Sequence, residues 1–411
     1  MSGGWRTLAC WLALALVLAA LPLALRSGAA LSTASLAGIA IVFALSYNML
    51  LGQTGMLSFG HAVYYGIGAY GAVHGMNMIV AARAPLPLPL VPMLGGLAGL
   101  CFAAIFGWVS TRRSGTAFAM ISLGLAELAG SSSLILRSFF GGEEGVTTDR
   151  TRLPRLFDLS FGPQIQVYYL IAFWCLAAAA LMYGITRTPF GRMCNAVRDN
   201  AARVPYVGVD PHVLRFMAFC LSGFFAGVAG ALAAINFEIA NSAYFGAAQS
   251  GNVLLATFVG GAGHFAGPVA GAILVTCLQT LLGDVTDVWQ LYFGLMFMAV
   301  VMYLPGGLAS LWTMQIPLWR AGRLAHVLPW YGVAALPAVA AFAGFAGMVE
   351  MTAQLTLRRA EGPAMSLAGL GLRADAAWPW IVALACLAGG VLACRLVGPK
   401  AAAARDRALA S

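Results

Sequence analysis

YNMLLGQTGMLSFGHAVYYGIGAY, the stretch Tyr47–Tyr70, joins two long apolar runs at 30–50 and 61–80. A helix needs about 20 apolar residues to cross the hydrocarbon core of a bilayer, and both runs reach that length. Three glycines lie between them with the polar residues Gln53, Thr54 and Ser58, and Asn48 and His61 lie at the adjoining ends of the runs. Irregular backbone at this depth is stable only where protein buries it or where it lines a water-filled path. The stretch therefore predicts a helical membrane protein with a broken or re-entrant glycine-rich segment.

The composition of the 411 residues agrees, because 61% are hydrophobic and only 9% are charged. Soluble globular proteins carry about 25% charged and about 45–50% apolar residues. The composition excludes an ordinary soluble enzyme, and burial on this scale excludes a disordered chain. The alternating ten-residue segments of a membrane β-barrel are not visible. We expect an all-α, polytopic membrane protein that contacts lipid and, despite a net charge of +9, no nucleic acid.

Twelve apolar runs predict membrane-spanning helices. They lie at 8–25, 30–50, 61–80, 88–109, 114–135, 166–186, 214–235, 246–260, 266–283, 288–304, 328–349 and 378–397. The first ten form a predicted transmembrane domain, 1–310, and the last two lie in a C-terminal extension, 311–411. The run at 246–260 is short, which indicates a tilted, re-entrant or broken helix.

The charged residues give an expected orientation. If the N-terminus is cytoplasmic and all twelve runs cross, most basic residues lie inside and most acidic residues lie outside. Cytoplasmic loops are enriched in Lys and Arg. We therefore expect both termini in the cytoplasm. The segment 187–213 then lies inside, and the segment 136–165 lies outside.

Residues for catalysis or cofactor binding are sparse. Lys400 is the only lysine and lacks the glycines of a Walker A loop, so we expect no ATP site and no other cofactor in this chain. The eight cysteines form no C-x-x-C pair, and most lie within apolar runs, which favours buried small hydrophobic residues. Ser222 and His264 are the residue types of a membrane protease pair, but Ser222 lies in a small-residue helix-packing pattern. We expect no catalytic residues and no metal ligands.

Polar side chains at membrane depth are candidates for the lining of a translocation path. The candidates are Asn48, Gln53, Thr54, Ser58, His61, Glu127, Asn252 and His264. Broken helices leave helix ends pointing inward, where free N–H groups and the helix dipole can meet a carboxylate. The alternative for the glycine-rich break is tight helix packing alone. For Glu127, the only acid within a predicted span, the alternatives are a structural partner, a position nearer the interface, or proton coupling.

A weak repeat relates LLGQTGMLSFGHAVYYGIGA at 50–69 to LLATFVGGAGHFAGPVAGA at 254–272. Their Gly-His pairs lie 203 residues apart. The repeat suggests two parallel halves. Chance similarity between glycine-rich segments is the alternative.

The segment 187–213 is basic, and 192–203 predicts a short helix that Pro205 limits. A short helix held parallel to the membrane is suited to docking on a soluble partner, whereas the alternative is a basic loop that only fixes topology. The candidate contact residues are Gly191, Arg192, Arg198, Asp199, Asn200 and Gly208.

Four segments together resemble one transporter family. They are the stretch Tyr47–Tyr70 quoted above, GRMCNAVRDNAARVPYVGVD (Gly191–Asp210), FMAFCLSGFFAGVAGAL (Phe216–Leu232) and FVGGAGHFAGPVAGA (Phe258–Ala272). In this order they resemble the integral membrane permease subunit of branched-chain amino acid ABC transporters, LivM type. The resemblance covers most of residues 30–310.

The resemblance implies an importer subunit that moves branched-chain or related amino acids across the inner membrane. It also implies partners: a second permease subunit, two cytoplasmic ATPase subunits that use ATP, and a periplasmic substrate-binding protein. The segment 187–213 would be the coupling loop that docks on an ATPase. Two alternatives stay open, namely an ABC permease for urea, short amides or another small solute, and an ATPase-independent secondary transporter.

Two features depart from the pattern of that family. Ala201–Pro205 stands where an alanine- and glutamate-rich helix is expected, and the proline should shorten the helix. The extension 311–411 adds two spans beyond the usual core, which we interpret as an accessory or partner-contacting hairpin.

Overall fold

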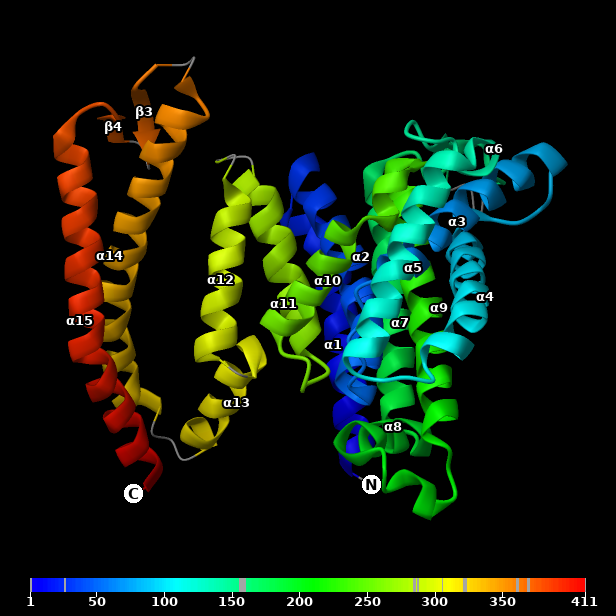
Figure 1. The fold of residues 1–411 in the computed structure, drawn as a ribbon, viewed down its shortest axis with the longest axis horizontal. Coiled ribbons are helices and arrows are strands. Elements are labelled where there is room, and N and C mark those ends of the chain that lie inside the picture. The colour runs from blue at the N-terminus through cyan, green and yellow to red at the C-terminus, as the bar shows by residue number, and fades with distance from the viewer. Residues whose placement is uncertain are drawn as a thin grey trace. The chain divides into compact units, whose positions relative to one another are not determined.

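The structure, a computed structural model, describes residues 2–25, 27–154, 160–283, 286, 288–304, 306–320, 324–359, 362–367 and 370–410. Most of them are helical, which confirms the predicted all-α fold (Figure 1). The chain falls into two compact units. Unit 1 comprises Met1–Thr280 and Met296–Ala309, and unit 2 comprises Leu281–Leu295 and Ser310–Ser411.

Unit 1 is built from helices joined mostly by short turns. The longer helices are α1 (Ser2–Ala24), α2 (Gly28–Thr54), α3 (Ala62–Ala82), α4 (Val91–Ser110), α5 (Thr116–Ile135), α7 (Gln164–Arg187), α8 (Pro189–Asn200), α9 (Pro211–Phe237), α10 (Ala247–Gly260) and α11 (Gly267–Cys277). The shorter elements are α6 (Arg137–Phe140), the 3-10 turns η1 (Leu88–Leu90), η2 (Arg150–Arg152), η3 (Val204–Val207) and η4 (Ser242–Phe245), and the π-helical turn η5 (Leu278–Leu282). Helix α12 (Trp289–Tyr303) has residues in both units.

Unit 2 is dominated by two long helices, α14 (Leu324–Thr356) and α15 (Ala377–Ala410), which pack along each other. Glycines allow this close approach, because a Cβ atom on Gly344 would lie only 2.5 Å from the carbonyl oxygen of Ala383. The strands β3 (Ala364–Leu367) and β4 (Leu370–Arg373) form an antiparallel hairpin between the two helices. The two helices predicted for the extension are therefore present. The structure adds α13 (Gly307–Arg320) before them, which was not predicted.

Eight helices of the described residues are long and apolar enough to cross a membrane, or up to nine if α12 and α13, bent by 45°, form one span. Each of the twelve predicted runs contains a helix. However, α10 has 14 residues, and α11 together with η5 forms one apolar helix over Gly267–Leu282. At 1.5 Å per residue they reach about 21 Å and about 24 Å, less than a hydrocarbon core of about 30 Å. The run at 246–260 thus forms a short helix, and whether this helix is tilted, re-entrant or half of a broken span stays a prediction.

Helix α3 is not among the eight helices that qualify by length and composition. Its 21 residues are enough to cross a membrane, but tyrosines, glycines, His74 and Asn77 make it less apolar than the eight qualifying helices. Most of α3 is buried inside unit 1, against α9 and α4. The protein is a multi-pass membrane protein in which several interior helices carry polar residues.

Helix α9 is the centre of unit 1, and it packs against α2, α3 and α4. Small residues explain this position, because they let helix backbones approach closely where lipid offers no hydrophobic driving force. A Cβ atom on Gly230 would overlap the carbonyl oxygen of Tyr65 in α3, and one on Gly227 would overlap that of Gly95 in α4. The predicted packing role of this small-residue pattern therefore agrees with the structure.

The cysteines follow the prediction only in part. Cys175 and Cys194 are buried, whereas Cys10, Cys101 and Cys386 lie on exposed helix faces of the chain. An apolar run does not show which of its faces points inward, so the expectation of burial was wrong for these three.

The glycine-rich stretch interrupts the helix as predicted. Helix α2 ends at Thr54, and Gly55 follows in the left-handed conformation (φ 72°) that favours glycine. The chain then returns alongside α2, because the His61 ring lies 3.0 Å from the Ser46 hydroxyl. Helix α3 consequently begins beside the middle of α2, with its N-terminus inside unit 1. We call residues 55–61 the first break.

A second helix–break–helix unit follows later in the chain. Helix α10 ends at Gly260, Gly261 has φ 105°, and α11 begins at Gly267. We call residues 261–266 the second break. Both breaks follow a helix, start near a glycine with positive φ, and contain the Gly-His pair of the weak sequence repeat. This structural similarity favours a true internal repeat over chance similarity between glycine-rich segments.

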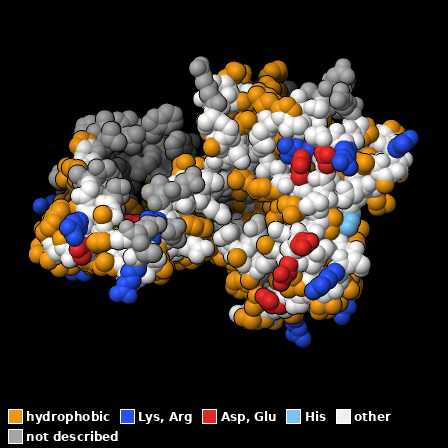
Figure 2. Space-filling model, turned by 90° about the horizontal axis from the view of Figure 1, so that it is seen from above, with side chains coloured by type: hydrophobic (Ala, Val, Ile, Leu, Met, Phe, Trp, Pro, Cys, Tyr) orange, Lys and Arg blue, Asp and Glu red, His pale blue; other side chains and the backbone are white. Residues whose placement is uncertain are grey.

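The short elements gather at the two ends of unit 1 (Figure 1). Helix α8 lies at the same end as the N-terminus, and α6 lies at the opposite end. Near α6, the strands β1 (Val146–Thr147) and β2 (Ile239–Ala240) pair antiparallel. Figure 2 looks onto this end and shows acidic and basic side chains among apolar ones. The expectation that 187–213 and 136–165 lie on opposite sides agrees with this arrangement.

Candidate functional site

A network of buried hydroxyl and ring groups surrounds the first break. The Tyr47 hydroxyl donates to the Ser58 carbonyl oxygen at 2.9 Å, and the Ser222 hydroxyl donates to the Ser46 carbonyl oxygen at 2.6 Å. Ser46 and Ser222 are fully buried. The network therefore joins α2, the first break and α9 in the middle of unit 1.

Two serines hold the backbone where the first break passes into α3. The Ser122 hydroxyl of α5 accepts from the Phe59 amide, and the Ser250 hydroxyl of α10 accepts from the Ala62 amide, both at 3.0 Å. The first N–H groups of a helix have no partner within the helix. Because α3 begins inside the protein, serines from two other helices supply the acceptors.

The geometry around His61 indicates which ring nitrogen carries the proton. The Ser46 hydroxyl donates to the Phe43 carbonyl oxygen at 2.7 Å, so its oxygen accepts from the His61 ring. In the neutral ring Nε2 is then the donor and Nδ1 is the bare acceptor. Nδ1 is buried and has no hydrogen-bond partner among the described residues.

Two further polar atoms of the predicted site are buried without a partner in the described part of the chain. They are Asn48 Oδ1 and Ser58 Oγ. A buried unpartnered polar group costs about 1–3 kcal/mol, so such groups are rare unless water or another molecule meets them. The interior around the first break therefore offers hydrogen-bonding capacity that the protein itself does not use.

The remaining predicted path residues lie in different places. Thr54 is buried and donates back to the Leu50 carbonyl oxygen, and Gln53 is half-buried with Oε1 unpartnered among the described residues. Glu127 is exposed on α5, and His264 is exposed in the second break. The structure thus joins Ser58 and His61 in one network but does not bring Glu127 or His264 into it.

Asn252 lines a cavity of about 290 Å³ between α2, α3, α9, η4, α10, α11 and η5. Its walls combine apolar groups such as Ile39 and Phe43 with polar ones such as Tyr65 and Gln249. A cavity of this size lies near the lower end of the range for small-molecule sites. Sequence reasoning selected Asn252 but missed the cavity, because its walls come from distant segments.

The predicted cytoplasmic helix is present as α8, three residues earlier than expected. Thr188 caps it by accepting from the Gly191 amide at 3.4 Å, and Pro189 occupies the first helical position. The helix ends at Asn200, whose side chain accepts from the Ala202 amide. Pro205 lies in the turn η3, so the predicted shortening by this proline is consistent with the structure.

One face of α8 packs on the protein and the other faces outward. Gly191, Cys194 and Val197 are buried, and burial raises the pKa of the Cys194 thiol to about 12. A Cβ atom on Gly191 would lie 2.5 Å from the Thr186 carbonyl oxygen, so only glycine fits there. Among the predicted contact residues, the exposed ones are Arg192, Arg198, Asp199, Asn200 and Gly208.

Arg198 behaves differently from its neighbours on α8. Its guanidinium donates to the Gly52 carbonyl oxygen at the end of α2, and its Nε lies 3.1 Å from the Asp199 carboxylate. The Asp199 side chain is 69% exposed, against 37% for Arg198. Arg198 therefore reaches from α8 to the end of α2 while its side chain stays partly exposed and paired with Asp199.

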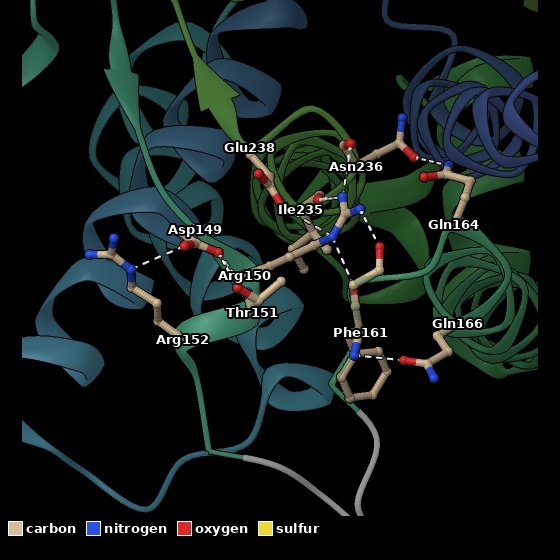
Figure 3. Close-up of polar contacts among 11 residues, drawn as sticks. Asp149, Arg150, Thr151, Arg152, Phe161, Gln164, Gln166, Ile235, Asn236 and Glu238 are labelled. Atoms are coloured by element: carbon tan, nitrogen blue, oxygen red, sulfur yellow. Dashed lines mark hydrogen bonds and ion pairs between the residues drawn. The ribbon is translucent and has the colours of Figure 1, made fainter.

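A second polar cluster lies at the other end of unit 1, centred on Arg150 (Figure 3). Its guanidinium donates to four carbonyl oxygens: Phe161 at 2.8 Å, Ile235 at 2.9 Å, Asn236 at 3.1 Å and Gly162 at 3.2 Å. Its Nε also lies 3.2 Å from Glu238 Oε1. Arg150 thus ties the segment 136–165 to the last carbonyls of α9, which have no partner within the helix.

Neighbouring groups hold the Arg150 turn in shape. The Asp149 carboxylate accepts from the hydroxyl and the amide of Thr151, and these hydrogen bonds lower the pKa of Asp149. Sequence reasoning identified the segment as polar and outside but not Arg150, because several arginines occur there. Only the fold shows that the Arg150 side chain is largely buried, with 11% of its surface exposed.

We expect Arg150→Met to lower the free energy of unfolding by about 3 kcal/mol, because it leaves four carbonyl oxygens without a donor. Unfolding in mixed micelles with increasing SDS measures this change. Arg152→Met is the matched control, since Arg152 is 71% exposed and pairs with Asp149 on the surface. We expect the control to change stability by about 0–1 kcal/mol. Equal effects of the two variants would contradict the role assigned to Arg150.

Comparison with known proteins identifies the family of the chain. The family described as branched-chain amino acid transport system / permease component matches residues 29–305. The high-affinity branched-chain amino acid transport system permease protein LivM of Escherichia coli K12 is 26% identical over 306 residues, which cover 69% of this chain and 71% of that protein. The corresponding LivH protein of Salmonella typhimurium LT2 is 25% identical over 259 residues, covering 58% of this chain and 80% of LivH.

An archaeal relative extends the comparison. The probable branched-chain amino acid transport permease protein LivM of Methanocaldococcus jannaschii is 24% identical over 324 residues, covering 66% of this chain and 90% of that protein. No solved structure matches the chain significantly. The family match ends at residue 305, so the helices α13 to α15 lie beyond it. Because the match spans more than half of the sequence, the chain belongs to the permease component family of branched-chain amino acid transport systems.

Proposed function

We propose that this chain is a transmembrane subunit of an ABC importer that moves branched-chain or related amino acids inward across the inner membrane. Separate ATPase subunits provide the energy, and this chain binds no ATP or other cofactor. Family membership supports transport of this substrate class. The observation that carries the proposal is α8, a short helix outside the long helices that is fixed on α2, α7 and α9 and exposes its outer face.

The first break supports a role in the translocation path. A branched-chain amino acid presents a carboxylate, an ammonium group and an apolar side chain. The N-terminus of α3 opens inside unit 1, where the helix dipole favours a carboxylate. Met56, Phe59 and Tyr64 supply apolar surface nearby. Tight capture belongs to a separate periplasmic binding protein, so the path needs only weak sites.

The proposed assembly contains a second permease subunit, two ATPases and the periplasmic binding protein. The exposed side of α5 carries Glu127, which has no partner among the described residues, together with Gly124 and Ser131. A carboxylate at membrane depth needs polar surroundings. This face therefore suits contact with a second permease or with the shared path between the two.

The orientation follows from α8. If α8 meets cytoplasmic ATPases, the N-terminus is cytoplasmic too, because both lie at one end of unit 1 (Figure 1). The end with Arg150 then faces the periplasm and is available to the binding protein. This arrangement is the one that the positive-inside rule indicates.

Uptake in cells tests the substrate class. Cells that lack this chain should lose high-affinity uptake of labelled leucine, and the plasmid-borne chain should restore it. Unlabelled isoleucine and valine should compete with leucine, whereas urea and acetamide should not. Restored uptake of urea or acetamide in place of leucine would overturn the substrate assignment while leaving the permease family intact.

Cysteine labelling tests the lining role of the first break. In a variant without the native cysteines, Gln53→Cys should react with small water-soluble thiol reagents, because Gln53 is half-buried. Ser58→Cys and His61→Cys should react only in the assembled transporter with ATP and substrate, since both positions are buried in this structure. A cysteine at exposed Gly208 serves as the positive control. Protection of all three test positions in every state would show that the break is packing alone.

A further inference from the structure

Arg198 connects α8 to the end of α2 through a hydrogen bond to one backbone carbonyl. The amides of Gly55 and Met56 bond to the carbonyls of Leu51 and Leu50. The Gly52 carbonyl oxygen in the same last turn accepts from the Arg198 guanidinium instead. A helix C-terminus carries partial negative charge, which favours a cation at this position. Arg198 therefore acts as the cap of α2, although it belongs to a different helix.

The capped end of α2 is also where the second break makes contact. A Cβ atom on Gly52 would lie 2.6 Å from the carbonyl oxygen of Ala262. On the other side, a Cβ atom on Gly55 would lie 3.1 Å from Cγ of Arg198. Glycines at these two positions thus leave room for the second break and for the arginine stem. We call the group Gly52, Gly55, Arg198 and Ala262 the break junction.

The break junction lies between the surface of α8 and the buried network. From Gly55 the first break runs inward to Ser58 and His61, while the second break leads from Ala262 into α11. The guanidinium joins α8 to the Gly52 carbonyl without an intervening side chain, so a displacement of α8 would act on this carbonyl directly. Packed interfaces of this kind move as units, so a small shift at one end repositions the other.

We propose that Arg198 is the positioning residue that transmits movement of α8 to both breaks, and is not part of the surface that docks on the ATPase. This proposal rests on the proposed function, because it requires an ATPase to move α8. It assigns the docking role to exposed groups of α8 such as Arg192 and Asp199. Asp199 also holds the guanidinium in place through the contact at 3.1 Å.

The test compares Arg198→Gln, Arg198→Lys and the control Arg113→Gln in the complete transporter in proteoliposomes. Arg113 is exposed in the turn between α4 and α5 and carries the same charge. We measure leucine uptake, ATP hydrolysis and the amount of ATPase that co-purifies. Arg198→Gln should lower uptake per ATP hydrolysed about tenfold. ATP hydrolysis and co-purified ATPase should stay at the wild-type level. Arg198→Lys, which keeps the charge and a donor, should show a smaller loss.

A fluorescent reporter separates transmission from a general structural effect. Gly263 in the second break is exposed, and a Cβ atom there has no neighbour within 4 Å. A fluorophore on Gly263→Cys, in a background without the native cysteines, should change its emission when ATP is added. Arg198→Gln should abolish this change, and Arg113→Gln should preserve it.

Two results would overturn the proposal. One is wild-type uptake with a preserved emission change in Arg198→Gln. The other is a loss of co-purified ATPase that parallels the loss of uptake, which would make Arg198 a docking residue. Failure of the proposed function looks different, because the wild-type complex itself would then show no ATP-dependent uptake.

Discussion

Gly230→Ala should leave little folded protein in the membrane. A Cβ atom at this position would overlap the backbone carbonyl of Tyr65, which no side-chain rotation relieves. Helices α9 and α3 would have to separate, and the buried contacts of α9 with its other neighbours would weaken with them. We expect a loss of more than about 4 kcal/mol, which exceeds the effect of most single substitutions. Size-exclusion chromatography after detergent extraction measures the folded fraction.

The matched control is Gly184→Ala on α7. Gly184 is a helical and exposed glycine, and a Cβ atom there meets nothing within 4 Å. Alanine is a better helix former than glycine, so this variant should fold at least as well as the wild type. If Gly230→Ala extracts as folded protein in the same yield, the close packing of α9 against α3 is contradicted.

The double substitution Ser122→Ala and Ser250→Ala should have the second-largest effect. It removes the acceptors of the Phe59 and Ala62 amides, both inside unit 1. Each unpartnered amide costs about 1–3 kcal/mol, so the first break should lose its fixed path into α3. We expect uptake to fall at least about tenfold while most of the protein still inserts. Initial rates of leucine uptake, normalised to the amount of protein in the membrane, measure the effect.

Ser114→Ala is the control for this pair. Ser114 is exposed in the turn that precedes α5, the helix that carries Ser122. This variant should leave uptake unchanged. Rescue by Ser122→Thr would support the hydroxyl as the relevant group. Unchanged uptake in the double variant would show that the two serines do not hold the break in place.

Most of the fold could be predicted from hydrophobicity alone. Each apolar run predicts a helix because bilayer thickness imposes a length, and a helix stands at every predicted place. The errors have physical causes. α13 was missed because 307–320 is short and mixes polar with apolar residues. For the run at 246–260 three alternatives stayed open, because composition does not show where a helix breaks between glycines. Thr188 and Pro189 are typical N-cap and first-turn residues, and they indicate the start of α8 at Pro189. Using this pair to set the boundary would have placed the helix correctly.

The candidate site was predictable only where the sequence concentrates unusual residues. The glycine-rich stretch pointed to Ser58 and His61, and both lie in the buried network. Ser122 and Ser250 were missed because a single serine within an apolar helix looks the same whether it faces lipid or a partner helix. Arg198 was identified, but its direction was not, since only the packing of α8 shows that this arginine reaches Gly52. Whether these residues line the path remains a prediction.

The most direct test of the account is ATP-driven uptake in proteoliposomes that contain this chain, the second permease and the two ATPases, with the binding protein and labelled leucine outside. The account predicts accumulation against a gradient only when ATP is inside and all components are present, and no accumulation when this chain is omitted. Uphill leucine uptake by this chain alone, without any ATPase, would contradict it. So would ATP-driven uptake that proceeds at the same rate when this chain is absent.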